Sequence, residues 1–398
     1  MAAGALTRTM RWPPLPELFS TSRSLPAAVL AALLFAIGAR TAAAAPAAPA
    51  APAAPAAIRR VDTIRVPGVP LASFDIGFVN GAGIYALSDR SNKSVDLFRA
   101  ASGKFIGRVA GFTGYDQAAG FGSAGPDGIV AVGDREFWAG DGDSTVKVVD
   151  VKSRSIVASI PTGGRKRVDE MGFDPRDHLV IVVNNADKPP FVSFISSRTR
   201  KISGKLLLRR ATGGAEQPVW DPATGLVYLS IPVVDHAAAE GAVAVIDPRT
   251  RRLEKLFAVH ECMPAGLAVG PDGHLLVGCS DDAVSAGFAA KSLVMDARSG
   301  KIVATIGEVG GSDEVWYDAK SRHYYLAAGG NTGGPVLGVI DARTDRWIAN
   351  LASGPHAHSV AADPKTGKVF VPIAAQADGG ACASGCIAVY AGGNEGKQ

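Results

Sequence analysis

The stretch "EQPVWDPATGLVYLSIP" (residues 216–232) decides the fold. An acid opens it, a short apolar run with a tryptophan follows, "DPATG" intervenes, and a second apolar run closes it. Short runs rich in aromatic and β-branched residues, separated by Asp, Pro and Gly, indicate a β-hairpin. The stretch "SDEVWYDAKSRHYYLAAGG" (312–330) has the same order of features. The chain therefore repeats one hairpin with a carboxylate at its start.

The hairpin recurs along most of the chain. Its turns read VNGAG, VGDRE, FDPRD, WDPATG, VGPDG, YDAKS and ADPKTG. The residues that follow the first apolar run of each hairpin are Asn80, Gly133, Asp174, Asp221, Gly270, Asp318 and Asp363. Neighbouring positions are 41 to 53 residues apart, which is typical of a four-stranded propeller blade. The repeats predict an all-β fold, a seven-bladed β-propeller over residues 58–393.

The two ends of this region predict how the ring closes. After "CIAVYAGG" (386–393) only the short tail 394–398 remains, so the last blade lacks a fourth strand. The segment "IRRVDTIRV" (58–66) precedes the first hairpin and has the composition of a spare outer strand. We expect this N-terminal strand to complete the seventh blade, because closure removes exposed sheet edges.

The repeats resemble a known family. "IYALSDRSNKSVDLF", "GLVYLSIP…GAVAVIDPRTRRL" and "GPHAHSVAADPKTGKVFVPI" are similar to the WD40-like blades of the bacterial YVTN-type seven-bladed propellers. The resemblance covers residues 58–393 and implies an extracytoplasmic protein. It implies no activity, because its motifs are specific for the fold and carry no catalytic residues.

The N-terminal residues resemble a targeting segment. Residues 1–45 contain four arginines, one acid and the apolar run "PAAVLAALLFAIGA" (26–39), followed by small residues. This pattern predicts a cleaved signal peptide and a periplasmic or secreted protein with no stable membrane span after cleavage. The alternative is an uncleaved anchor. The Ala/Pro-rich residues 46–57 predict an extended linker.

The charge of the chain argues against nucleic acid as a partner. The net charge is +4, and it falls to +1 without residues 1–45. A nearly neutral surface offers no basic patch for phosphates.

The four cysteines predict two disulfides. In "CMPAGLAVGPDGHLLVGC" the hairpin register places Cys262 opposite Cys279, within disulfide reach. Cys382 and Cys386 lie close together in the loop "GGACASGC". An oxidising compartment would favour both bonds. The alternatives are a thiolate metal site and a buried, inert thiol at Cys262.

The repeated acid predicts a ring around one channel mouth. In a propeller the first strand of each blade lines the channel, so the residues five before each turn position should converge there. They are Asp75, Gly128, Asp169, Glu216, Ala265, Asp313 and His358, with Asp127 next to the glycine. Such oxygens would suit a divalent cation: Ca²⁺, Mg²⁺, Mn²⁺ or Zn²⁺. The alternative is that water and backbone amides solvate the acids. Strand alternation predicts that Glu170 and Glu314 turn away from the axis.

The loops between second and third strands open on the same face. They are rich in Asp, Asn and Gly, and their candidate binding residues are Asn184, Asn185, Asp235, Asp281 and Asn331. The connection 111–128 should cover this mouth with Tyr115 and Phe121. Turn-forming preference alone is the alternative explanation of this composition.

Two functions fit these features. The first is a non-catalytic propeller that binds a small-molecule ligand or a protein on its channel-mouth face. The second is a metal-dependent hydrolase of lactonase-like type, with Asp169, Glu216, Asp313 and His358 as ligands or base. The chain contains no catalytic motif in a convincing context, so the sequence leaves enzymatic activity undecided.

Overall fold

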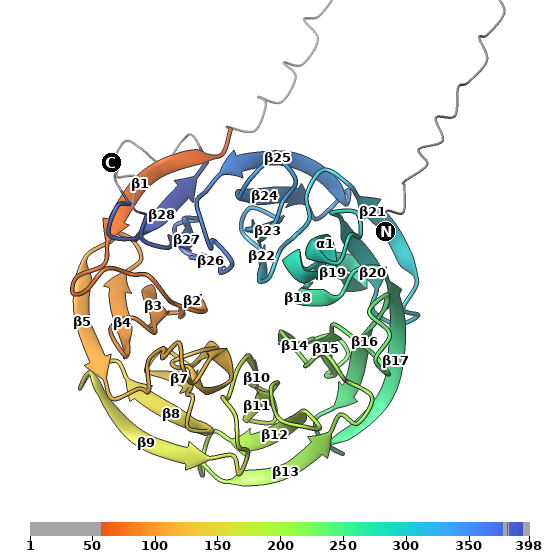
Figure 1. The fold of residues 1–398 in the computed structure, drawn as a ribbon, viewed down its shortest axis with the longest axis horizontal. Coiled ribbons are helices and arrows are strands. Elements are labelled where there is room, and N and C mark those ends of the chain that lie inside the picture. Colours follow the sequence, from red (N-terminus) through yellow and green to blue (C-terminus); the bar gives the residue numbers. More distant parts are fainter. Residues whose placement is uncertain (1–56, 377–379, 381, 393–398) are drawn as a thin grey trace, which may run out of the picture. The chain divides into compact units, whose positions relative to one another are not determined.

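The computed structural model describes residues 57–376, 380 and 382–392. The expected signal peptide (1–45), residues 46–56 of the expected linker and the tail 394–398 lie outside the described residues. The described residues form seven four-stranded antiparallel sheets arranged radially around one axis (Figure 1). The prediction of an all-β, seven-bladed propeller is confirmed.

The strands follow the chain from the channel outward in each blade. In the first three blades they are β2 (Gly77–Val79), β3 (Ile84–Asp89), β4 (Ser94–Arg99), β5 (Phe105–Ala110), β6 (Ile129–Val132), β7 (Glu136–Gly140), β8 (Thr145–Asp150), β9 (Ser155–Pro161), β10 (Met171–Asp174), β11 (Leu179–Asn184), β12 (Phe191–Ser196) and β13 (Ile202–Leu207). In the next three they are β14 (Pro218–Trp220), β15 (Val227–Ile231), β16 (Glu240–Asp247), β17 (Arg252–His260), β18 (Pro264–Val269), β19 (His274–Cys279), β20 (Ser292–Asp296), β21 (Ile302–Ile306), β22 (Val315–Asp318), β23 (His323–Ala328), β24 (Val336–Asp341) and β25 (Arg346–Ala352).

The seventh blade contains both ends of the described fold. It consists of β26 (Ala361–Ala362), β27 (Val369–Ile373), β28 (Cys386–Ala391) and the N-terminal strand β1 (Arg59–Arg65). Strand β1 pairs antiparallel with β28, and Ile64 lies opposite Ile387. The prediction that the N-terminal strand closes the ring is therefore confirmed (Figure 1).

The core lies between neighbouring blades. Second strands such as β11 and β15 are buried along their whole length, whereas the outer strand β13 alternates between half-buried and exposed residues. One cluster joins Ile181 and Val183 of blade 3 to Leu229 and Ile231 of blade 4. Each blade therefore buries both faces against its neighbours. Only outer strands show the alternation of covered and exposed residues that is typical of a half-exposed sheet.

The two ends of the hairpins differ in structure. At the turn ends, the carboxylates of Asp174, Asp221, Asp318 and Asp363 accept hydrogen bonds from backbone amides two or three residues later. These turns are short and closed on themselves. The loops at the other end are longer. One of them contains a short helix that the sequence did not predict, α1 (Asp281–Ser285), which the Ser280 side chain caps by accepting from Ala283 N.

Both predicted disulfides are present. Cys262 bonds to Cys279, with Cα atoms 4.5 Å apart, and Cys382 bonds to Cys386. Within the described ranges, no helix is long and apolar enough to cross a membrane.

Candidate functional site

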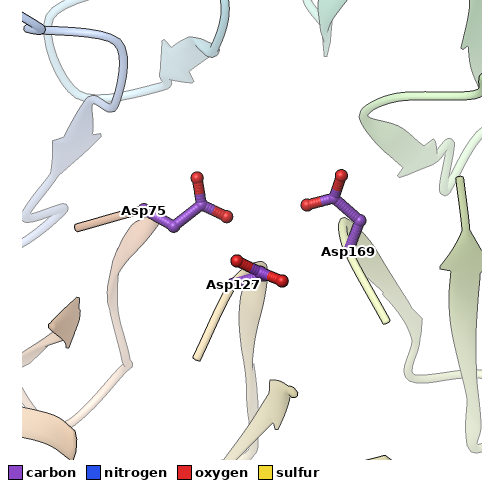
Figure 2. A group of neighbouring side chains, drawn as sticks. All are labelled: Asp75, Asp127 and Asp169. Atoms are coloured by element: carbon purple, nitrogen blue, oxygen red, sulfur yellow. The ribbon is translucent and has the colours of Figure 1, made fainter. Parts of the chain in front are cut away.

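Three aspartates from consecutive blades meet at the channel mouth. Asp75, Asp127 and Asp169 each stand two residues before the inner strand of blades 1, 2 and 3, and their carboxylates point toward one another (Figure 2). One oxygen from each lies within 4.8 Å of the others, and all three side chains are buried. The chain approaches itself closely here, since a Cβ at Gly128 would lie 2.4 Å from the carbonyl oxygen of Asp169.

The buried Arg90 and the half-buried Arg167 neutralise much of this charge. Arg90 Nε donates to Asp127 Oδ1 at 2.6 Å, and Arg90 Nη2 lies 3.0 Å from Asp75 Oδ1. Arg167 Nη2 donates to Asp169 Oδ2 at 2.6 Å. The sequence analysis missed both arginines. The available signals were the position of Arg90 in the mouth loop "DRSNK" and that of Arg167 two residues before a ring acid.

The arginines act unequally on the three carboxyl groups. Burial raises the pKa of Asp75, but the charge of Arg90 and the hydrogen bond from His358 outweigh it, so the net pKa is lowered. Burial keeps the pKa of Asp127 well above its usual range and raises that of Asp169, despite the arginines beside them. Asp127 and Asp169 therefore hold protons more readily than free aspartates do, and Asp75 holds its proton less readily.

His358 joins the triad from blade 7. Its ring stacks on Phe74 with centroids 4.8 Å apart, and its Nε2 lies 3.3 Å from Asp75 Oδ1. Its Nδ1 faces the carbonyl oxygen of His356 at 2.8 Å. Both ring nitrogens face acceptors, which favours the doubly protonated imidazolium. Burial lowers the pKa of His358, but Asp75 and Asp313 outweigh burial and raise it.

The other predicted ring acids have no such partners. Among the described residues, the carboxylates of Glu216 and Asp313 accept no hydrogen bond and form no ion pair. Burial raises the pKa of Asp313 to about 7, although His358 partly offsets the shift. Burial, then the charges of Asp169 and Asp313, keep the pKa of Glu216 well above its usual range.

Two further acids form a second tier. Glu170 and Glu314 are buried, and the carboxylate of Glu314 accepts from Ser359 Oγ and Val360 N. Burial raises the pKa of Glu170 and the charge of Glu314 raises it further. Their blades, 3 and 6, lie on opposite sides of the ring (Figure 1). That both side chains turn away from the axis stays a prediction.

A cavity of about 600 Å³ opens above these groups. Its walls are Asp75, Arg90, Phe121, Arg167, Asp281, Gly311, Asp313, Gly329, Pro335, Pro355, His356 and His358. Phe121 is 55 % exposed and stacks on Tyr115 with ring centroids 4.6 Å apart. The connection 111–128 thus contributes an aromatic side chain to the mouth.

The loop candidates divide into two groups. Asn185 donates to the Asp169 carboxylate, and Asp281 lines the cavity. Asn184 donates to Ser144 Oγ and to the carbonyls of 166 and 167, and so braces the loop that carries Arg167. Asn331 accepts from Gly310 N, and Asp235 forms an exposed ion pair with Arg210. The structure does not bring Asn184, Asn331 or Asp235 into the cavity wall.

The opposite end of the channel differs in chemistry. A cavity of about 390 Å³ there is lined mainly by apolar and aromatic side chains, including Phe78, Phe173, Trp220, Trp316 and Tyr317. Charged side chains are absent from the described residues of its lining. Chemistry that needs charge therefore belongs at the mouth.

The carboxylate oxygens of the Asp triad are suitable ligands for a metal ion, but the positive charges beside them disfavour one. Asp75 Oδ2 and Asp127 Oδ2 are buried without a hydrogen-bond partner, and hard cations prefer carboxylate oxygens. Arg90 and Arg167 already pair with the same three carboxylates. A divalent ion there would lie beside two guanidinium groups and be repelled by both. Glu216, Asp313 and His358, the other predicted ligands, lie outside this close group.

The comparisons with known proteins show a similarity of fold alone. No family model and no curated protein matches the chain. A chain of Kuenenia stuttgartiensis hydrazine synthase is similar, with a TM-score of 0.63 and 14 % identity, over 77 % of this chain and 93 % of that one. A chain in the crystal structure of the mitotic checkpoint complex is also similar, with a TM-score of 0.60 and 14 % identity, over 92 % and 99 % of the two chains. The chain is thus a seven-bladed β-propeller, and its similarity to YVTN-type propellers rests on the sequence motifs.

Proposed function

We propose that the protein is an extracytoplasmic binding protein that holds a small-molecule ligand in its channel mouth. One observation carries this proposal: among the described residues, the carboxylates of Glu216 and of the cavity-lining Asp313 have no hydrogen-bond or ion-pair partner. Unpaired carboxylates in a confined site are costly, so a fold that keeps them suggests a ligand that compensates them. A cavity of about 600 Å³ is of the size that small molecules occupy.

The location in the periplasm or outside the cell is part of the proposal. The signal-like residues 1–45 support it, and so do the two disulfides, because such bonds persist mainly in oxidising compartments. A protein partner on this face is the other form of binding that the sequence allows. The recessed position of the charged groups favours a small molecule over a protein surface.

A thermal-shift screen with the chain from residue 46 onward tests the proposal. We expect a small molecule to raise the melting temperature of the wild type and to lose that effect in the double variant Asp313→Asn/Glu216→Gln. A control variant, Glu254→Gln, changes an exposed acid on the outer strand β17 and should keep the shift. If every hit acts equally on wild type and double variant, the mouth is not the binding site.

A metal-dependent hydrolase is the second candidate, favoured by the two unpartnered oxygens of Asp75 and Asp127. Elemental analysis of the protein distinguishes it from the first. An equimolar divalent cation that is lost in Asp127→Asn or Glu216→Ala would support the hydrolase. The proposal predicts no such stoichiometric metal, because Arg90 and Arg167 neutralise the triad.

A further inference from the structure

The charges of the channel mouth do not balance. Three carboxylates are matched by three cationic side chains, since Asp75, Asp127 and Asp169 contact Arg90, Arg167 and His358. Five more carboxyl groups lack an ion pair among the described residues. They are Glu170, Glu216, Asp281, Asp313 and Glu314. The groups without an ion pair are therefore all acids, and a ligand that pairs with their ionised forms must be a cation.

Glu170 is a buried acid without a protein partner. The residue is only 8 % exposed, and its carboxylate has no hydrogen bond or ion pair among the described residues. Burial raises its pKa, and the charge of Glu314 raises it further. Buried polar groups in folded proteins are nearly always paired, so an unpaired buried carboxyl indicates a missing partner.

The acids are arranged at two depths. Asp313 belongs to the mouth, and Glu314 is the next residue of the same segment toward β22. Asp169 and Glu170 have the same relationship before β10. One residue of extended chain advances about 3.3 Å, so the second tier lies deeper along the channel. A single ion would satisfy one tier, whereas an elongated ligand with more than one positive charge would reach both.

The mouth also offers apolar contact. Phe121 lines the cavity and is 55 % exposed, and the Arg90 guanidinium lies 5.7 Å from its ring centroid, so part of the ring surface is open to a bound molecule. An inorganic ion is attracted to a phenyl ring only through its charge. Methylene groups gain free energy from the same contact, because it removes them from water.

We infer that the channel mouth binds an aliphatic di- or polyamine, whose ammonium groups pair with Asp313, Glu216 and Glu170 and whose methylene carbons pack on Phe121. This inference rests on the proposed function and names its ligand class. An anion has no equivalent place, because the guanidinium groups of Arg90 and Arg167 are already paired with carboxylates.

Isothermal titration of the chain from residue 46 onward with spermidine, 1,5-diaminopentane, butylamine, Ca²⁺ and Mg²⁺ tests the inference. We expect one site for the first two, with weaker binding of butylamine and of both metal ions. Asp313→Asn and Glu216→Gln should each weaken spermidine binding about 10- to 100-fold, the usual effect of losing a charged hydrogen bond. The matched control Glu254→Gln should leave the affinity unchanged.

Phe121→Ala provides an independent test, because an exposed side chain can be removed without loss of the fold. It should weaken spermidine binding about 2- to 5-fold, as expected for the loss of a contact between a cation and an aromatic ring. Spermidine binding that is unaffected by all three mouth variants would overturn the inference, and so would metal binding without amine binding. If another class of molecule binds and depends on Asp313, the proposed function stands and the amine inference fails. If neither the amines nor any screened molecule binds, both fail.

Discussion

Arg90 joins two blades of the propeller through the carboxylate of Asp127. Arg90 follows β3 of blade 1, and Asp127 precedes β6 of blade 2; the two side chains are 4 % and 0 % exposed. The guanidinium also donates to the carbonyl oxygen of Phe74 at 3.0 Å. The Arg90 side chain therefore stabilises the mouth and neutralises part of its negative charge. The acids without a counter-charge belong to blades 3 to 6.

Replacing Arg90 with methionine should destabilise the protein strongly. The variant removes the closest counter-charge of Asp127 and leaves that carboxylate only Arg167, at 3.8 Å, while Asp75 keeps only His358, at 3.3 Å. Breaking a buried pair typically costs about 3–5 kcal/mol. Urea unfolding at pH 8 measures the change. The control Arg210→Met removes an exposed pair with Asp235 and should change the free energy of unfolding little. Equal effects of the two substitutions would contradict the role given to Arg90.

Asp313→Asn should stabilise the protein more as the pH rises. The pKa of Asp313 is about 7 in the folded protein, against an ordinary value of 3.8. The carboxyl group loses its proton at a lower pH in the unfolded chain than in the folded protein. Its contribution to the free energy of unfolding therefore becomes more unfavourable as the pH rises from about 4 to about 7. The melting temperature of the variant relative to wild type should therefore increase by a few degrees from pH 5 to pH 8. A difference that stays constant over this range would refute the shift.

The two disulfides should contribute unequally to stability. Cys262 and Cys279 are 17 residues apart, and Cys382 and Cys386 are 4 apart. Loop-closure entropy assigns about 3 kcal/mol to the longer loop and about 2 kcal/mol to the shorter. Denaturant unfolding of the two double serine variants measures both. A larger loss for Cys382→Ser/Cys386→Ser would show that local strain or packing outweighs chain entropy.

Removing strand β1 should open the ring. A chain that begins at residue 67 exposes the edge of β28, and unpaired edges promote association. We expect aggregation or a broad, less cooperative unfolding transition, measured by size-exclusion chromatography and thermal unfolding. A chain that begins at residue 57 retains β1 and should behave as the longer protein does. Unchanged cooperativity without β1 would mean that the closure contributes little.

The sequence is sufficient to predict the fold because propeller blades repeat. Seven turn positions, each with its own apolar hairpin, determine the blade number, and the spare segment 58–66 determines the closure. The Cys262–Cys279 bond was predicted correctly, but the predicted register was wrong: Pro264 lies opposite Cys279, and Cys262 precedes β18. These features depend on local spacing, which a sequence displays directly.

The missing parts of the site depend on contacts across the ring. Arg90 and Arg167 lie in loops, where the direction of a side chain has no periodic signal. Alternation is a weak guide to Glu170 and Glu314, because both stand before their strands begin, at Met171 and Val315. A period of two holds only within regular strands.

Native mass spectrometry of the protein purified without added ligand tests the central claim most directly. The account predicts one small organic molecule per wild-type chain, retained by Glu254→Gln and absent from Asp313→Asn/Glu216→Gln. A ligand retained equally by all three proteins, or a wild type that neither carries nor takes up any small molecule, would contradict it.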